Sequence, residues 1–145
     1  MIKDVVISIR SLIDYGLEEE DRIEFSTDGV YQMAEGVAHI AYLETEVTGL
    51  QGTRTSVKVT PEKVIVDRRG GLTSRMEFFP GEKSSFLYET PMGMATMNMN
   101  TRSVRHRFDK NGGELEIDYV LDMEHTVVSR NKFLLTVREQ KEMGV

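Results

Sequence analysis

The chain has 145 residues, a formal net charge of −6 and no cysteine. The length predicts one domain over residues 1–145, with a core large enough to fold without disulfides. The missing cysteines exclude disulfides, thiolate metal ligands and a cysteine nucleophile. The acidic balance disfavours a nucleic-acid partner, because nucleic-acid affinity depends on neutralising phosphates with lysine and arginine.

The N-terminal segment MIKDVVISIR carries an apolar run too short for a signal-peptide core, and no small-residue cleavage site follows it. No apolar run approaches the ~18 residues needed to cross a bilayer. We therefore expect a soluble, cytoplasmic protein that does not interact with membranes.

Alternation of apolar and polar side chains predicts short strands along the whole chain. Turn signals separate them, among them Asp28-Gly29, which we interpret as a break before the short run at Tyr31 and Met33. The run VAHIAYLETEVT is interpreted as one long strand. The expected strands cover residues 4–12, 23–27, 37–48, 53–60, 63–69, 76–78, 84–89, 94–108, 112–123 and 127–138.

The clearest alternation lies between residues 112 and 138. Its first half carries carboxylates mostly at even positions and apolar side chains at odd ones, and the pattern continues after an expected turn at Glu124-His125. Two such runs predict an antiparallel hairpin with one face against a core and the other in water. The expected core-facing side chains are Leu115, Ile117, Tyr119, Leu121, Met123, Val127, Phe133, Leu135 and Val137.

The connections between the expected strands are nearly all of hairpin length, and no helix longer than a turn or two is expected. This organisation predicts an all-β fold, either a sandwich or a barrel. We favour a single antiparallel meander β-barrel of about 8–10 strands, because closing a twisted meander removes its exposed edges.

Three segments together resemble the YwiB-like family of uncharacterised bacterial proteins: YLETEVTGLQGTRTSVKV (42–59), FLYETPMGMATM (86–97) and GGELEIDYVLDMEHTVVSRNKF (112–133). The most specific feature is LYETP-x-G followed about twenty residues later by GGELEIDY. The resemblance spans nearly the whole chain, although the first strand and the acidic loop match only in character. It implies a closed or nearly closed lipocalin-like (calycin) barrel of cytoplasmic bacterial origin, and it carries over no activity or catalytic residue.

Four methionines fall close together, at Met92, Met94, Met97 and Met99. On a strand, Met97 and Met99 share a face. Methionine packs adaptably, so the pair could line a ligand cavity or simply fill the core. Binding of a soft metal is the third possibility, but no cysteine and no nearby histidine pair supports it, and we predict no metal site.

The segment RSVRHRFDK, residues 102–110, is strongly basic. Arg105 and Arg107 project together from a strand, and an outward patch of this kind could hold a phosphate or an RNA backbone. Arg102 and His106, if they point inward, could anchor the carboxylate of a ligand. Alternatively, the cations simply face the acidic side chains of the next strand, Glu114, Glu116 and Asp118.

The remaining carboxylates give no clear chemistry. Residues 18–21 are four adjacent acids that we interpret as a solvated loop. Glu44, Glu46 and Glu89 lie on expected strands and could pair as acid and base, or could face water. No phosphate loop, nucleophile elbow or zinc-protease motif is present in the sequence, so we predict no catalytic residue and no cofactor.

Two hypotheses about function follow. The first is a non-enzymatic barrel that holds a small apolar or amphipathic ligand against Tyr42, Tyr88, Met97 and Met99, with Arg102 and His106 as polar anchors. The alternative is a binding module for an anionic macromolecule, RNA or a protein, through the basic segment and especially Arg105 and Arg107. An enzymatic role has less support, and a homodimer is left open.

Overall fold

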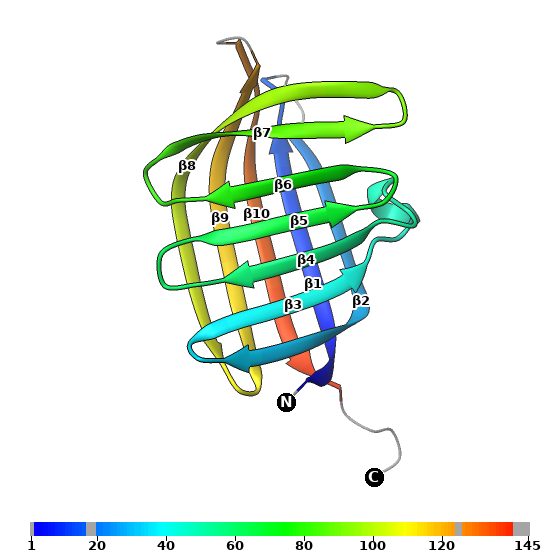
Figure 1. The fold of residues 1–145 in the computed structure, drawn as a ribbon, viewed down its shortest axis with the longest axis vertical. Helices are drawn as coiled ribbons and strands as arrows, with labels where there is room; N and C mark the ends of the chain where they lie inside the picture. The colour runs from blue at the N-terminus through cyan, green and yellow to red at the C-terminus, as the bar shows by residue number, and fades with distance from the viewer. Residues whose placement is uncertain (1, 17–19, 124–125, 141–145) are drawn as a thin grey trace.

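A computed structural model describes residues 2–16, 20–123 and 126–140, and this part of the chain forms ten β-strands and one short 3₁₀ helix. Consecutive strands pair antiparallel and β1 pairs with β10, so the sheet closes into a barrel (Figure 1). The predicted all-β antiparallel meander barrel is confirmed. The elements are β1 (Lys3–Asp14), β2 (Glu20–Ala34), β3 (Val37–Leu43), η1 (Glu46–Thr48), β4 (Arg54–Val59), β5 (Val64–Arg69), β6 (Thr73–Phe78), β7 (Lys83–Thr90), β8 (Gly93–Asp109), β9 (Gly112–Met123) and β10 (Thr126–Glu139).

The strands form two sets that cross each other. In Figure 1, β1, β9, β10 and most of β2 and β8 run along the long axis, and β3 to β7 cross them. The long strands β2 and β8 bend from one set into the other, as strands do at the corners of orthogonally packed sheets. In β8 the register against β9 shifts between Thr101 and Ser103, and a bulge of this kind bends a strand.

Gly29 lies inside β2, so the predicted break at Asp28-Gly29 is wrong. Gly29 lies within the ladder, opposite Val5 of β1 and Tyr42 of β3. A Cβ added there would lie 2.6 Å from the carbonyl oxygen of Ala41 and would also collide with the side chain of Ile7. Glycine is therefore required for the close approach of neighbouring strands, and the strand continues through it.

The expected strand over residues 37–48 is wrong at its C-terminal end. β3 ends at Leu43, and η1 follows with Thr45 as its N-cap, whose side chain accepts a hydrogen bond from the Val47 amide at 3.3 Å. Gly49 closes the turn with a positive φ of 75°, a conformation that glycine adopts without strain. Before this turn the Glu44 amide donates to the Thr53 carbonyl at 2.8 Å, and Glu44 itself is buried.

The predicted hairpin over residues 112–138 is confirmed as β9 and β10, but two of its expected core-facing side chains are exposed. Met123, the last residue of β9, is 39% exposed. The register shifts between Val127 and Ser129, so the side chain of Val127 is 56% exposed instead of facing the core. The expected turn at Glu124-His125, and Glu18 and Glu19 of the acidic loop, lie outside the described residues.

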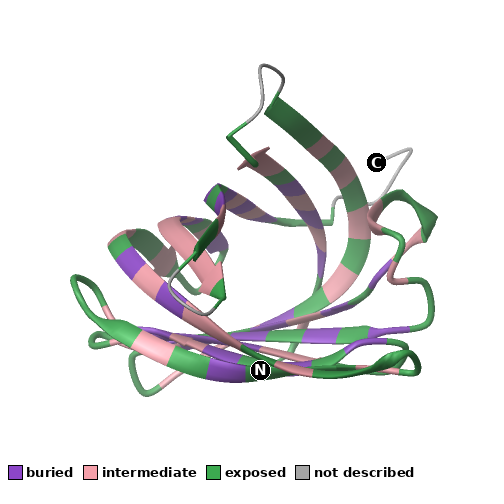
Figure 2. Ribbon diagram, turned by 90° about the horizontal axis from the view of Figure 1, so that it is seen from above, coloured by how far each residue is buried: buried purple, intermediate pink, exposed green. Residues whose placement is uncertain are grey.

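Alternation along the strands separates the inner from the outer face, as the stripes of buried and exposed residues in Figure 2 show. One region of the interior is filled completely by apolar side chains, and none of its central members is more than 2% exposed. We call this region the packed half. It is defined by Val5, Ile7, Tyr31, Ile40, Val57, Val64, Met99, Leu115, Ile117 and Leu135.

Candidate functional site

A second set of inward-facing side chains is only partly buried. Ladder partners share a face of the sheet, so Leu121 opposite buried Met99, and Phe25 opposite buried Ile9, point into the barrel. Both nevertheless retain partial exposure, so these side chains face inward without being fully enclosed. We call this set the open half, which comprises Ser11, Ile13, Ile23, Phe25, Tyr88, Ala95, Met97 and Leu121.

Four of the predicted ligand-binding residues lie on the inner wall. Tyr42 on β3 and Met99 on β8 are 4% and 1% exposed and belong to the filled part of the interior. Met97, two residues before Met99, is partly exposed, and Tyr88 on β7 is 37% exposed at the rim. The structure therefore places Tyr42, Tyr88, Met97 and Met99 on one continuous inner wall, across the boundary between the two halves.

Arg102 and His106 do not join this wall. Arg102 follows Thr101 at the bulge in β8 and is exposed. His106 is opposite buried Leu115 in the ladder, yet the histidine side chain is itself exposed. Neither residue lies among the partly buried side chains of the open half, so neither is placed to anchor a ligand there.

The basic segment faces the acidic one across the sheet. Arg105 is opposite Glu116 and Arg107 is opposite Glu114 in the β8–β9 ladder. On the other side of β9, Lys132 Nζ lies 3.1 Å from Glu116 Oε1. Because both arginines are exposed, each cross-strand pair contributes only about 0.2–1 kcal/mol, but together the acids reduce the positive potential of the strand.

The interior also contains a buried carboxylate, Glu44, which is one of the three glutamates that the sequence analysis considered as an acid or base. The Glu44 side chain is 2% exposed, and its two oxygens accept hydrogen bonds from Thr55 Oγ1 at 2.7 Å and from Thr48 Oγ1 at 3.0 Å. Glu46 and Glu89 are exposed, so the three glutamates form no acid–base pair.

Beside this carboxylate lies a second interior charge, Arg68 on β5. Its Nε is 3.8 Å from Glu44 Oε1, and one terminal nitrogen contacts Met76 Sδ at 3.9 Å. The Arg68 side chain is 19% exposed, but its Nε is buried and makes no hydrogen bond within the described chain. The sequence did contain a signal, because Arg68 has the same parity as the apolar residues Val64 and Val66.

Two tyrosines flank the charge pair. Burial, and next the charge of Glu44, raise the pKa of Tyr42 well above its usual range, while Arg68 opposes the shift. Burial also raises the pKa of Tyr119, again against the influence of Arg68. The Tyr119 ring meets Phe78 edge-on, with ring centroids 4.9 Å apart. Both phenols are therefore protonated at neutral pH.

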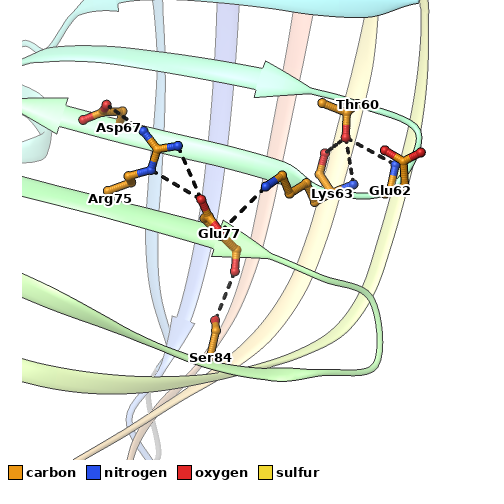
Figure 3. A network of polar contacts seen from close by, with 7 residues as sticks. All are labelled: Thr60, Glu62, Lys63, Asp67, Arg75, Glu77 and Ser84. Carbon is orange, nitrogen blue, oxygen red and sulfur yellow. Dashed lines mark hydrogen bonds and ion pairs between the residues drawn. The ribbon is translucent and has the colours of Figure 1, made fainter.

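The outer wall carries a different kind of polar network. Arg75 pairs with Glu77 at 3.4 Å and with Asp67 at 3.8 Å, and Lys63 reaches Glu77 at 3.8 Å (Figure 3). Asp67 and Arg75 also line a surface cleft of about 360 Å³. These side chains are solvent-accessible, so the pairs add little stability each and offer no desolvated chemistry.

Two further observations concern the part of the chain that the structure describes. No group of three histidine, aspartate or glutamate side chains there is arranged to hold a metal ion. The same residues contain no helix with the length and apolar character that a membrane crossing requires.

The chain is similar to known proteins over most of its length. The uncharacterized beta-barrel protein YwiB of Bacillus subtilis (strain 168) is 26% identical over 115 residues, which cover 79% of each protein. The crystal structure of ywiB protein from Bacillus subtilis matches at a TM-score of 0.85 and 21% identity, over 97% of this chain and 94% of that chain. This likeness shows the fold, and the resemblance noted in the sequence is confirmed. A family model described as a domain of unknown function, DUF1934, matches residues 7–135, and the chain therefore belongs to this family.

Proposed function

We propose that the chain is a non-enzymatic binding protein for a small apolar or amphipathic ligand held in the open half of the barrel. One observation carries the proposal: apolar side chains that face inward, such as Phe25, Met97 and Leu121, retain contact with water. Each Å² of apolar surface that a ligand removes from water stabilises the complex by about 25 cal/mol. The packed half has no such surface to offer.

The chemistry of the wall suits a ligand of loosely defined shape. Met97 has a flexible thioether that adapts to irregular surfaces. Tyr88 presents an apolar ring with a polar tip at the rim. Of the residues predicted from the sequence, the proposal keeps Tyr88 and Met97 as ligand contacts and Tyr42 and Met99 as the buried wall beside them, and it leaves out Arg102 and His106.

Native mass spectrometry of freshly purified protein, with and without an added apolar probe such as octanol, tests the proposal. Ala95 points inward between Tyr88 and Met97, so Ala95→Trp would fill the open half, whereas Thr96→Trp places the same ring on the exposed outer face. We expect bound mass on the wild type and on Thr96→Trp, and its loss on Ala95→Trp. Wild-type protein that shows only its own mass under every condition would contradict the proposal.

The alternative function is the binding of an anionic macromolecule, RNA or a protein, through Arg102, Arg105 and Arg107. Its support is the exposure of all three arginines, together with a surface cleft of about 980 Å³ that Arg107 and Arg138 help to line. Glu114 and Glu139 line the same cleft, which weakens the attraction for an anion. Charge reversal at Arg105 and Arg107 that leaves a co-purifying partner fully bound would remove this alternative.

The lipocalin-like (calycin) kinship, the cytoplasmic location and the homodimer stay predictions. None of them enters the ligand-binding proposal, which depends only on the inner wall.

A further inference from the structure

We propose that the ligand of the open half carries a carboxylate, and that Arg68 is the residue that anchors it. The inference rests on the proposed function, because it names the head group of the ligand that the barrel would hold. It is argued from unused hydrogen-bond donors, from their position at the rim of the open half, and from the apolar wall beside them.

Arg68 has donors without acceptors. A guanidinium group has five N–H donors, and within the described chain Arg68 donates to a single acceptor, Met76 Sδ at 3.9 Å. Thioether sulfur is a weak acceptor. The Glu44 carboxylate lies 3.8 Å from Nε, beyond hydrogen-bond length. Because Nε is buried without a partner and an unsatisfied buried donor is destabilising, a ligand that supplies an acceptor would relieve this cost.

Glu44 does not take up these donors, because its own oxygens are occupied by hydroxyl groups. Thr55 and Thr48 donate to the two oxygens, and the carboxylate is held in place at the end of β3. Glu44 thus offsets the cost of bringing the Arg68 charge into the barrel, while Arg68 Nε is left without an acceptor in the described chain.

The position of Arg68 connects it with the open half. Arg68 is opposite Ser74 in the ladder, Ser74 is opposite Tyr88, and Tyr88 is opposite Ala95. All four side chains therefore lie in one row of the inner wall. Tyr88 and Ala95 belong to the open half, and the Arg68 side chain in the same row is itself 19% exposed.

Apolar surface lies close to this anchor. The ring of Phe25 is 6.4 Å from the ring of Tyr42, measured between centroids, and Tyr42 is next to Thr55, the ladder neighbour of Arg68. A guanidinium group beside an apolar wall complements an amphiphilic ligand that carries a carboxylate head group. Arginine binds carboxylates through two parallel hydrogen bonds, and charge-assisted bonds are about twice as strong as neutral ones, which favours a carboxylate over a hydroxyl or an ester.

Calorimetric titration with octanoate and octanol, and with dodecanoate and dodecanol, separates the head group from the chain. We expect wild-type protein to bind each carboxylate about tenfold or more tightly than the matched alcohol, which corresponds to about 1.4 kcal/mol. Arg68→Met keeps the apolar stem and removes the fork, so the carboxylate should lose this advantage while the alcohol binds as before. Arg68→Lys keeps the charge but not the fork, and should retain only part of the preference.

Arg54→Met is the matched control, because Arg54 is exposed on the outer face of β4, next to Thr55, and this variant should titrate like the wild type. Unchanged binding of the alcohols shows that Arg68→Met is folded. Equal affinity of wild-type protein for acid and alcohol, or an undiminished preference in Arg68→Met, would overturn the anchor and leave the proposed function standing. If none of the four probes bound to the wild type, the proposed function itself would fail.

Discussion

The same strands build the packed half and the open half of the interior. Comparing the two halves separates the direction in which a side chain points from the extent to which it is buried. On β9, Leu115 and Leu121 share the inward face, yet Leu115 is 1% exposed and Leu121 is partly exposed. On β8, Met97 and Met99 differ in the same way. A period of two determines which side chains point inward, but whether they meet other side chains depends on how the strands bend and cross around them.

The largest expected effect on stability comes from making the same leucine-to-alanine substitution once in each half. Leu115→Ala should lower the free energy of unfolding by about 2–5 kcal/mol, because it removes a fully enclosed side chain and leaves a cavity. Leu121→Ala should cost about 1 kcal/mol or less, because its side chain already contacts water. Urea denaturation followed by circular dichroism measures both values, and equal losses would show that the two halves are packed alike.

The next effect concerns the corner of β2 that shapes the packed half. Gly29→Ala should destabilise the fold by about 1–3 kcal/mol, because its Cβ collides with the Ile7 side chain and lies 2.6 Å from the Ala41 carbonyl oxygen. Gly71→Ala is the control, since its Cβ would meet only Thr53 Oγ1, at an ordinary 3.7 Å. The same denaturation experiment applies, and a Gly29→Ala protein as stable as Gly71→Ala would refute the close approach.

A smaller effect appears at alkaline pH, at the boundary between the halves. Burial raises the pKa of Tyr42 above its ordinary value of 10.0, and the charge of Glu44 raises it further. Above about pH 10 the unfolded chain loses the phenol proton and the folded chain keeps it, so stability is complete at lower pH and falls as the pH rises.

In Tyr42→Phe this decline should therefore be shallower than in the wild type, by up to about 1.4 kcal/mol per pH unit. Urea denaturation between about pH 9 and pH 11 measures the slope. Tyr15→Phe is the matched variant, because the Tyr15 side chain is 48% exposed, and it should decline as the wild type does. Identical slopes in Tyr42→Phe and the wild type would contradict the assignment.

The smallest effect lies outside both halves. The exposed arginines Arg105 and Arg107 are opposite Glu116 and Glu114, so replacing both arginines by glutamate puts like charges across the ladder. We expect a loss of about 1–2 kcal/mol in total at low salt, which shrinks as salt is added. Thermal unfolding at two salt concentrations measures it. A loss that salt does not reduce would mean that these arginines act through packing instead of charge.

Much of the fold follows from local patterns. The alternation between residues 112 and 138 predicts β9 and β10 and most of their core-facing side chains, because neighbours two residues apart share a face whatever the rest of the chain does. Two of the misses have non-local causes. At Gly29, three strands approach each other, and at Val127 a bulge shifts the face. Neither the approach nor the bulge is visible in a single segment.

The candidate site was less predictable for the same reason. The inward position of Tyr42, Met97 and Met99 is predictable, because apolar and aromatic residues on an inward face are recognisable by parity. Arg68 was missed because one arginine at the end of an apolar strand resembles a solvated end, and only the ladders bring it beside Glu44. Arg102 lies at the register shift between Thr101 and Ser103, without a ladder partner, and is exposed; a bulge of this kind cannot be read from one segment of sequence.

Oxidation of the methionines by peroxide, followed residue by residue with mass spectrometry, tests the central claim most directly. Met92 and Met94 are 96% and 66% exposed, Met97 lies in the open half, and Met99 is 1% exposed. We expect fast oxidation of Met92 and Met94, slower oxidation of Met97 and protection of Met99, with added octanoate slowing Met97 alone. Protection of Met97 equal to that of Met99 in ligand-free protein would show that the barrel is filled throughout, and would contradict the account.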